Sequence, residues 1–128
     1  MECCMFKSKN CNQEKYKIFA DYCSTGLWFF DDKSGVWLSC DPSKDMSSEF
    51  KQTLHDWMLY YKADRIRSNL GVISGCISLR MFNAIGQTLA QQLHHELRSS
   101  VFYQSIKENE LFCNIINDQT HIDATIKI

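Results

Sequence analysis

The sequence predicts one α+β domain in which two amphipathic helices pack on one face of an antiparallel sheet of about four to five strands. Apolar residues recur every three or four positions in 50–61 and again in 82–97, which indicates the two helices. Short apolar or alternating runs, separated by turn residues, lie before and after the helices and indicate the strands. Neither helix can bury its apolar stripe alone, so both are expected to cover the same sheet.

The length of the chain fits a single domain. Its 128 residues can form one core and are too few for two ordinary domains. Segment 1–14 is polar, so we expect a flexible tail there and one domain over 15–128. The tail lacks the apolar core of a signal peptide, and no run approaches the roughly 18 apolar residues of a membrane span. We therefore expect a cytoplasmic protein without a membrane partner.

Three strand-like segments precede the first helix. Residues 16–22 alternate loosely between apolar and polar side chains, and residues 27–30 are entirely apolar. A turn-rich cluster at 31–35 separates them from the apolar residues 36–38, so a hairpin around Lys33 to Gly35 is expected. Each segment is short enough to be one strand of a sheet.

The first helix is expected to begin close to Ser47. The hydroxyl of Ser47 can accept a hydrogen bond from a free amide of the first turn, and Glu49 lies favourably near the positive end of the helix dipole. One face of this helix is then apolar. It carries Phe50, Leu54, Trp57, Met58 and Tyr61.

The second helix, 82–97, has a glycine on its apolar stripe. Glycine inside a helix costs about 1 kcal/mol relative to alanine, so Gly86 indicates that a backbone or a large ring approaches closely, with Trp57 as the candidate. A strand follows at 101–103. Residues 112–128 are expected to form a terminal hairpin, because 122–128 alternate strictly after a turn at 117–119. The apolar stretch 70–79 between the helices is either a further strand or a loop folded back over the core.

The seven cysteines do not form a recognisable site. They are odd in number, scattered, and lack the two-residue spacing typical of a zinc site or the even set of a disulfide scaffold. We expect reduced thiols, no metal and no cofactor. A metal-binding module that uses the N-terminal cysteines is nevertheless one alternative hypothesis. The cysteines are Cys3, Cys4, Cys11, Cys23, Cys40, Cys76 and Cys113.

The histidines do not indicate a catalytic site either. His94, His95 and Glu96 are sequence neighbours, and neighbours on a helix point about 100° apart, so they cannot form one ligand set. His121 and Asp123 share a face of the terminal strand, which is more typical of a surface pair. We expect no enzymatic activity. A small cytosolic hydrolase that depends on a thiol or a histidine remains the alternative function.

Nucleic acid is not an expected partner. The net charge of −1 provides no general attraction to a polyanion. The one compact basic group, Lys62, Arg65 and Arg67, is not interleaved with the aromatic residues of a single-strand platform. A solvated helix end explains it better.

Several motifs between residues 16 and 103 recur in a known kind of protein. An Asp-Tyr pair at 21–22 and a Leu-Trp pair at 27–28 precede a helix with a central Trp57. A second helix with the internal Gly86 and a terminal Glu-Leu pair at 96–97 then leads into a Val-x-Tyr strand. In these respects the chain resembles small bacterial immunity proteins, including those of contact-dependent growth inhibition. The resemblance implies a cytosolic, non-catalytic protein that binds and neutralises one cognate toxin domain.

The charge distribution agrees with such a binding function. Residues 21–56 contain seven acidic residues and three lysines, a net charge of −4 in a nearly neutral chain. Nuclease toxins hold phosphates with basic side chains, so an acidic surface would complement them and speed association. Aromatic residues lie among the acids and are typical interface anchors. The expected partner-binding residues are Asp21, Trp28, Phe29, Asp31, Asp32, Trp37, Asp41 and Asp45. The competing interpretation is that these aromatics belong to the core and the acids to solvated turns.

Overall fold

The computed structural model describes residues 14–68, 74–111 and 125–128. The expected tail, 1–14, lies outside the described residues except for Glu14. The expected run 112–116 and turn 117–119 of the terminal hairpin also lie outside them.

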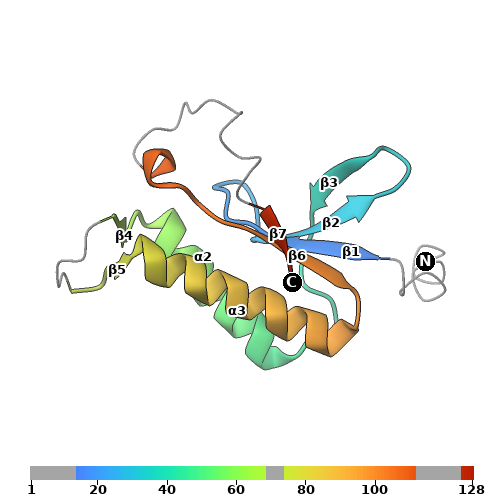
Figure 1. Cartoon of the computed structure of the whole chain (residues 1–128). Helices are drawn as coiled ribbons and strands as arrows, with labels where there is room; N and C mark the ends of the chain where they lie inside the picture. The colour runs from blue at the N-terminus through green and yellow to red at the C-terminus, as the bar shows by residue number, and fades with distance from the viewer. Residues whose placement is uncertain (1–13, 69–73, 112–124) are drawn as a thin grey trace.

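Two layers make up the fold, a five-stranded sheet and a pair of helices packed on one of its faces (Figure 1). The strand order is β3-β2-β1-β6-β7. The α+β class predicted from the sequence is confirmed. The sheet contains β1 (Lys15–Ile18), β2 (Leu27–Asp31), β3 (Val36–Ser39), β6 (Ser100–Gln104) and β7 (Thr125–Lys127), and the helices are α2 (Ser48–Lys62) and α3 (Leu79–Leu97). A small second sheet pairs β4 (Ile66–Arg67) with β5 (Ile77–Ser78), and the 3₁₀ turn η2 spans Glu108–Glu110.

The main sheet is mixed, whereas the sequence predicted an antiparallel one. Strands β1 and β6 pair in parallel, with Tyr16 opposite Val101 and Ile18 opposite Tyr103. The other neighbouring pairs are antiparallel. The connection between β1 and β6 contains both helices, and parallel pairing requires such a long crossover. Alternation within a strand does not encode the direction of its neighbour.

The predicted hairpins and strands differ from the structure mainly in their lengths. Strand β1 ends at Ile18, and the backbone then turns between Asp21 and Ser24 before β2 begins. The β2–β3 hairpin lies at the expected position. The described part of stretch 70–79 provides β5 and the start of α3, and β7 pairs with β6.

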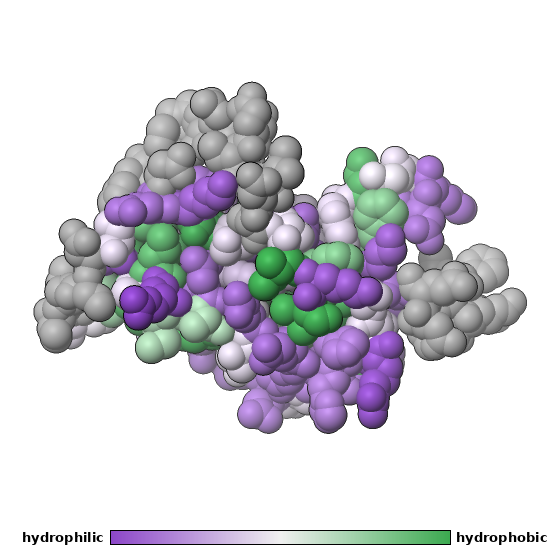
Figure 2. Space-filling model, in the orientation of Figure 1, coloured by the Kyte–Doolittle hydropathy of each residue, from purple (hydrophilic) through white to green (hydrophobic). Residues whose placement is uncertain are grey.

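The core lies between the helices and the central strands β1 and β6. Ile18, Val101 and Tyr103 are fully buried from the sheet side. From the helices, Trp57 stacks on Phe82 with ring centroids 4.5 Å apart, and its indole nitrogen donates to the Phe82 carbonyl at 2.9 Å. Figure 2 shows a mostly hydrophilic surface over the C-terminal half of α3. Both helices therefore pack on the sheet through the apolar faces that the sequence predicted.

Serine caps begin both helices. The Ser47 hydroxyl accepts from the Phe50 amide at 3.0 Å, as the sequence predicted. The second helix begins three residues earlier than expected, because Ser78 caps it by accepting from the Met81 amide at 3.0 Å. The extra turn carries the chain directly from β5 into α3.

A buried ring does lie against Gly86, and it belongs to Tyr103 instead of Trp57. A Cβ atom placed on Gly86 would lie 2.6 Å from Cζ of Tyr103, far closer than carbon atoms pack. The Tyr103 hydroxyl donates to Oδ1 of Asn83, which also accepts the Ile106 amide at 3.0 Å. Position 86 thus joins α3 to β6 at the centre of the core.

Glu96 fastens the end of α3 to the start of α2. Its carboxylate accepts the Ser47 amide at 2.9 Å, the Ser47 hydroxyl at 2.6 Å and the Gln92 side-chain amide at 3.0 Å. Burial raises the pKa of Glu96, but the hydrogen bonds from Ser47 outweigh it and hold that pKa below its usual range. The ionised carboxylate is therefore the form that the fold stabilises.

We expect Glu96→Ala to lower the free energy of unfolding by about 2 kcal/mol at neutral pH, because charge-assisted hydrogen bonds are lost. A carboxyl whose pKa is lowered by folding contributes stability above its unfolded pKa and loses it as the pH falls through the folded value. The difference from the native chain should therefore shrink below about pH 4. Urea titrations across pH measure this, with the exposed Glu108→Ala as the control. A difference that is constant with pH would contradict it.

Candidate functional site on the open face of the sheet

The face of the sheet opposite the helices carries aromatic rings and lysines. Because side chains alternate along a strand, the neighbours of the buried Tyr16, Ile18 and Val101 point to this other face. The register then places side chains of β2 and β3 beside them. We call these residues the open-face cluster: Lys15, Lys17, Trp28, Phe30, Trp37, Phe102 and Gln104.

In the open-face cluster, the Trp37 ring contacts the Phe30 and Phe102 rings edge to face. Trp37 lies 5.3 Å from Phe30 and 5.9 Å from Phe102 between ring centroids. The Lys15 ammonium lies 4.9 Å from the Phe30 centroid, and that of Lys17 lies 4.8 Å from the Trp37 centroid. Such cation–π contacts hold the lysines against the rings. The cluster is therefore an ordered surface before any partner arrives.

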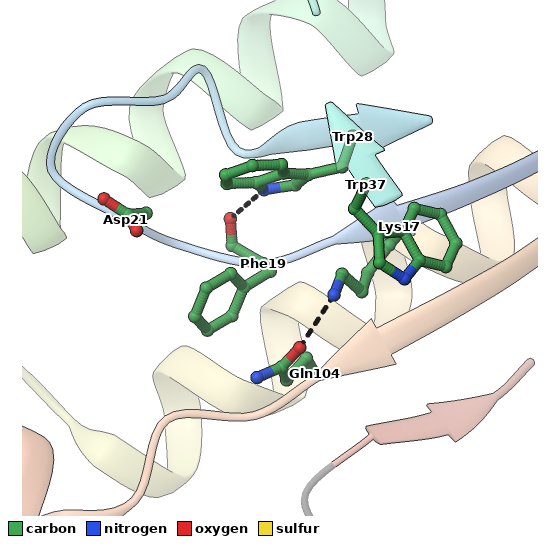
Figure 3. Close-up of a pocket in the computed structure, with 6 residues that line it drawn as sticks. All are labelled: Lys17, Phe19, Asp21, Trp28, Trp37 and Gln104. Carbon is green, nitrogen blue, oxygen red and sulfur yellow. Dashed lines mark hydrogen bonds between the residues drawn. The ribbon is translucent and has the colours of Figure 1, made fainter. Parts of the chain in front are cut away.

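Part of this surface is hollowed into a pocket of about 320 Å³. Its residues come from four strands, β1, β2, β3 and β6, and from the segment after β1 (Figure 3). The indole nitrogen of Trp28 donates to the Phe19 carbonyl at 2.9 Å, and Nζ of Lys17 donates to Oε1 of Gln104 at 2.9 Å. Burial lowers the pKa of Lys17 from its ordinary value. The lining residues are Lys17, Phe19, Asp21, Trp28, Trp37 and Gln104.

Three of the eight expected partner-binding residues meet at this pocket: Asp21, Trp28 and Trp37. Phe29 does not share their face. It pairs with Tyr16 and packs against the core, because adjacent residues of β2 point to opposite sides of the sheet. Trp28 and Trp37 therefore fit the interpretation as interface residues, whereas Phe29 fits the interpretation as a core residue.

The acidic residues are spread more widely than the aromatic ones. Asp31 ends β2 and Asp32 lies in the turn that follows, whereas Asp41 and Asp45 are exposed in the segment between β3 and α2. Of the five expected aspartates, Asp21 is the one that lines the pocket. The charges beside the exposed rings are those of lysines, so the open face differs from the acidic surface that the sequence suggested.

Sequence reasoning missed Lys15, Lys17 and Gln104. Lys17 and Gln104 are 87 positions apart, and they meet because β1 and β6 pair in parallel. One signal was present: the lysines alternate with the buried Tyr16 and Ile18, which places them on the face opposite the helices. The partner across the sheet was not visible in that local pattern.

Asp31 has a structural role in the β2–β3 turn. Its Oδ2 accepts the Ser34 hydroxyl at 2.6 Å and the Ser34 amide at 3.2 Å, next to Gly35 at a positive φ of 74°. The hydrogen bond from the Ser34 hydroxyl lowers the pKa of the Asp31 carboxyl. Asp32 is exposed. Removal of the Asp31 carboxylate would therefore affect the stability of the turn, whereas removal of the Asp32 carboxylate would not.

We expect Asp31→Asn to lower the midpoint of thermal unfolding at neutral pH, whereas Asp32→Asn leaves it unchanged. The folded carboxyl of Asp31 has a lowered pKa, so its contribution is present above the unfolded value and disappears in acid. Melting curves at neutral and acidic pH should show the two variants converging as the pH falls. Equal midpoints for both variants at neutral pH would exclude this role for Asp31.

Other residues with possible chemistry lie away from the pocket. Cys23, Cys40 and Cys76 form no disulfide within the described ranges. Nδ1 of His94 lies 2.7 Å from the Ser99 carbonyl at the end of α3. In the described ranges, no group of three or more His, Cys, Asp or Glu residues is placed to hold a metal ion, while Cys3, Cys4 and Cys11 lie outside those ranges. Among the described helices, none has the length and apolar character needed to cross a membrane.

Comparison with known proteins adds no assignment: neither a protein-family model nor a curated protein matches this chain. The resemblance to immunity proteins remains a prediction from the sequence motifs.

Proposed function

We propose that this protein is an immunity protein that binds one cognate bacterial toxin domain and neutralises it without catalysis. The binding surface is the open-face cluster. The observation that carries this proposal is the sheet face opposite the helices, which no other described element covers, with its partly buried rings. The exposed face of such a two-layer domain is ordinarily polar, whereas this face presents Trp37 in contact with the Phe30 and Phe102 rings, and Trp28 beside the Phe19 ring.

The chemistry of this face suits a protein partner. Interface hot spots are enriched in tryptophan, and they lie in preformed clusters from which a partner can exclude water. Trp37 is on the edge strand β3, where a partner can reach it without disturbing the core. Lysine stems beside the rings add apolar contact area, while their ammonium groups supply polar contacts.

The acidic residues would serve the encounter with the toxin. Asp31, Asp32, Asp41 and Asp45 lie outside the pocket, in the turn and the connection that flank strands β2 and β3. If the toxin is a nuclease with a basic cleft, these charges increase the association rate more than the final affinity. The aromatic face then supplies the short-range contacts. We propose that this binding takes place in the cytoplasm, where the toxin would reach its target.

Co-expression with a candidate toxin tests the proposal. The candidate is the variable C-terminal domain of a large secreted protein encoded by a neighbouring gene. We expect the two chains to co-purify as a stoichiometric complex and the chain to restore growth of cells that express the toxin domain. We also expect association to slow as salt rises, because attraction between exposed charges is screened. Failure to bind and to restore growth would refute immunity.

A further inference from the structure

The Lys17 ammonium has no acidic partner among the described residues. It is half-buried, and its surroundings are the Trp37 and Phe19 rings and the side chain of Gln104. An ammonium has three N–H donors, and Oε1 of Gln104 accepts one of them. The positive charge of the Lys17 ammonium therefore faces the pocket, and the described residues provide no counter-ion for it. A half-buried charge in that situation is costly unless a ligand compensates it.

Gln104 supplies a second donor, for which the described residues provide no acceptor. The residue is only 7% exposed, and its side chain lines the pocket. Because an ammonium can only donate, the atom that faces Lys17 must be Oε1, and Nε2 then points elsewhere, as Figure 3 shows. No described residue accepts from Nε2. A buried amide with unused N–H groups ordinarily requires an acceptor.

We propose that the Lys17–Gln104 pocket binds a carboxylate of the partner protein, carried by an aspartate or glutamate side chain. This assignment rests on the proposed function and names what the toxin must present. A carboxylate has two acceptor oxygens, so it can take N–H groups from Lys17 and Gln104 together while neutralising the charge. The tryptophan walls reduce access of water, which strengthens the ion pair.

A protein carboxylate fits the surroundings better than a nucleic-acid phosphate does. The chain has a net charge of −1, and residues 21–56 carry −4, which repels a polyanion. Asp21 also lines the pocket, on the far side of the Phe19 ring from Lys17 in Figure 3, and its Oδ1 accepts the Cys23 amide at 3.1 Å. One carboxylate at Lys17 adds a single charge, whereas a phosphate backbone would bring several close to these acids.

A titration without any toxin tests this assignment. The probe is N-acetylglutamate methylamide, added to ¹⁵N-labelled protein, and the neutral glutamine analogue is its matched control. We expect saturable shifts of the Gln104 side-chain amide and the Trp37 indole, with a dissociation constant in the millimolar range. Lys17→Met should weaken probe binding at least about tenfold, because an ammonium donor is lost. Lys15→Met, the same change two residues away on the same face, should weaken it less than about twofold.

In a second variant, a side chain of the protein itself provides the carboxylate in place of the probe. Gln104→Glu should pair with Lys17, raise the midpoint of thermal unfolding and abolish the probe shift of the Trp37 indole, which is the signal that this variant keeps. Absence of saturable shifts in the native chain would overturn the assignment, as would equal shifts with the glutamine analogue. Tighter binding of single-stranded oligothymidylate would overturn it in favour of nucleic acid. Because the titration contains no toxin, its failure would leave the proposed immunity function standing, and failure to bind a toxin would leave its result unchanged.

Discussion

Gly86→Ala is expected to lower the free energy of unfolding by about 3 kcal/mol, although alanine is the better helix former. The new methyl group would overlap the ring of Tyr103. That ring cannot easily move, because it is fully buried and its hydroxyl is held by Asn83. The midpoint of thermal unfolding should fall by roughly 10 °C. Calorimetry and urea unfolding measure both quantities.

A double-mutant cycle identifies the cause of that loss. Tyr103→Leu removes the ring and destabilises the core by itself, since it leaves a cavity and an unpaired Asn83. In that background Gly86→Ala should cost far less than it does in the native chain, because the overlap no longer exists. If the penalty is the same in both backgrounds, helix geometry explains the glycine and packing against Tyr103 does not.

Trp37→Ala is expected to weaken toxin binding by about 30-fold or more, the effect of losing about 2 kcal/mol at an interface hot spot. The ring is half-buried on an edge strand, so the isolated chain should keep its fold. Trp37 is a cleaner target than Trp28, whose indole nitrogen also holds the Phe19 carbonyl. Binding isotherms with the purified toxin domain measure the change.

Leu38→Ala is the matched control for this variant. Leu38 is the next residue of β3 and is 42% exposed, but its side chain lies on the helix side of the sheet. We expect less than about a threefold change in affinity, as for an exposed residue outside the contact. An equal loss of affinity in both variants would mean that the partner contacts both faces of the edge strand.

The helices were predictable because their signals are local. The Ser47 cap and the apolar stripe from Phe50 to Trp57 depend on residues a few positions apart, and a glycine inside a helix is itself a local sign of close packing. The identity of the ring at Gly86 was not predictable, since Tyr103 reaches it through the packing of β6 against α3. Tertiary packing between a helix and a strand decided that contact.

The same distinction applies to the candidate site. Alternation along β2 already separates Trp28 from Phe29, but which of them faces the helices depends on the pairing with β1. The sequence also suggested that charge near the aromatics would be acidic. Sequence neighbours such as Asp31 and Asp32 are acidic, whereas the neighbours in space are Lys15 and Lys17 from another strand.

The three tryptophans allow the central claim to be tested in one titration. Trp28 and Trp37 lie on the open face, and Trp57 is buried in the core. When unlabelled toxin domain is added to ¹⁵N-labelled protein, the indole N–H signals of Trp28 and Trp37 should shift and saturate at one equivalent, while that of Trp57 stays in place. Toxin binding that leaves both open-face indoles unchanged and instead shifts residues on the solvent side of α2 and α3 would show that the open-face cluster is not the binding surface.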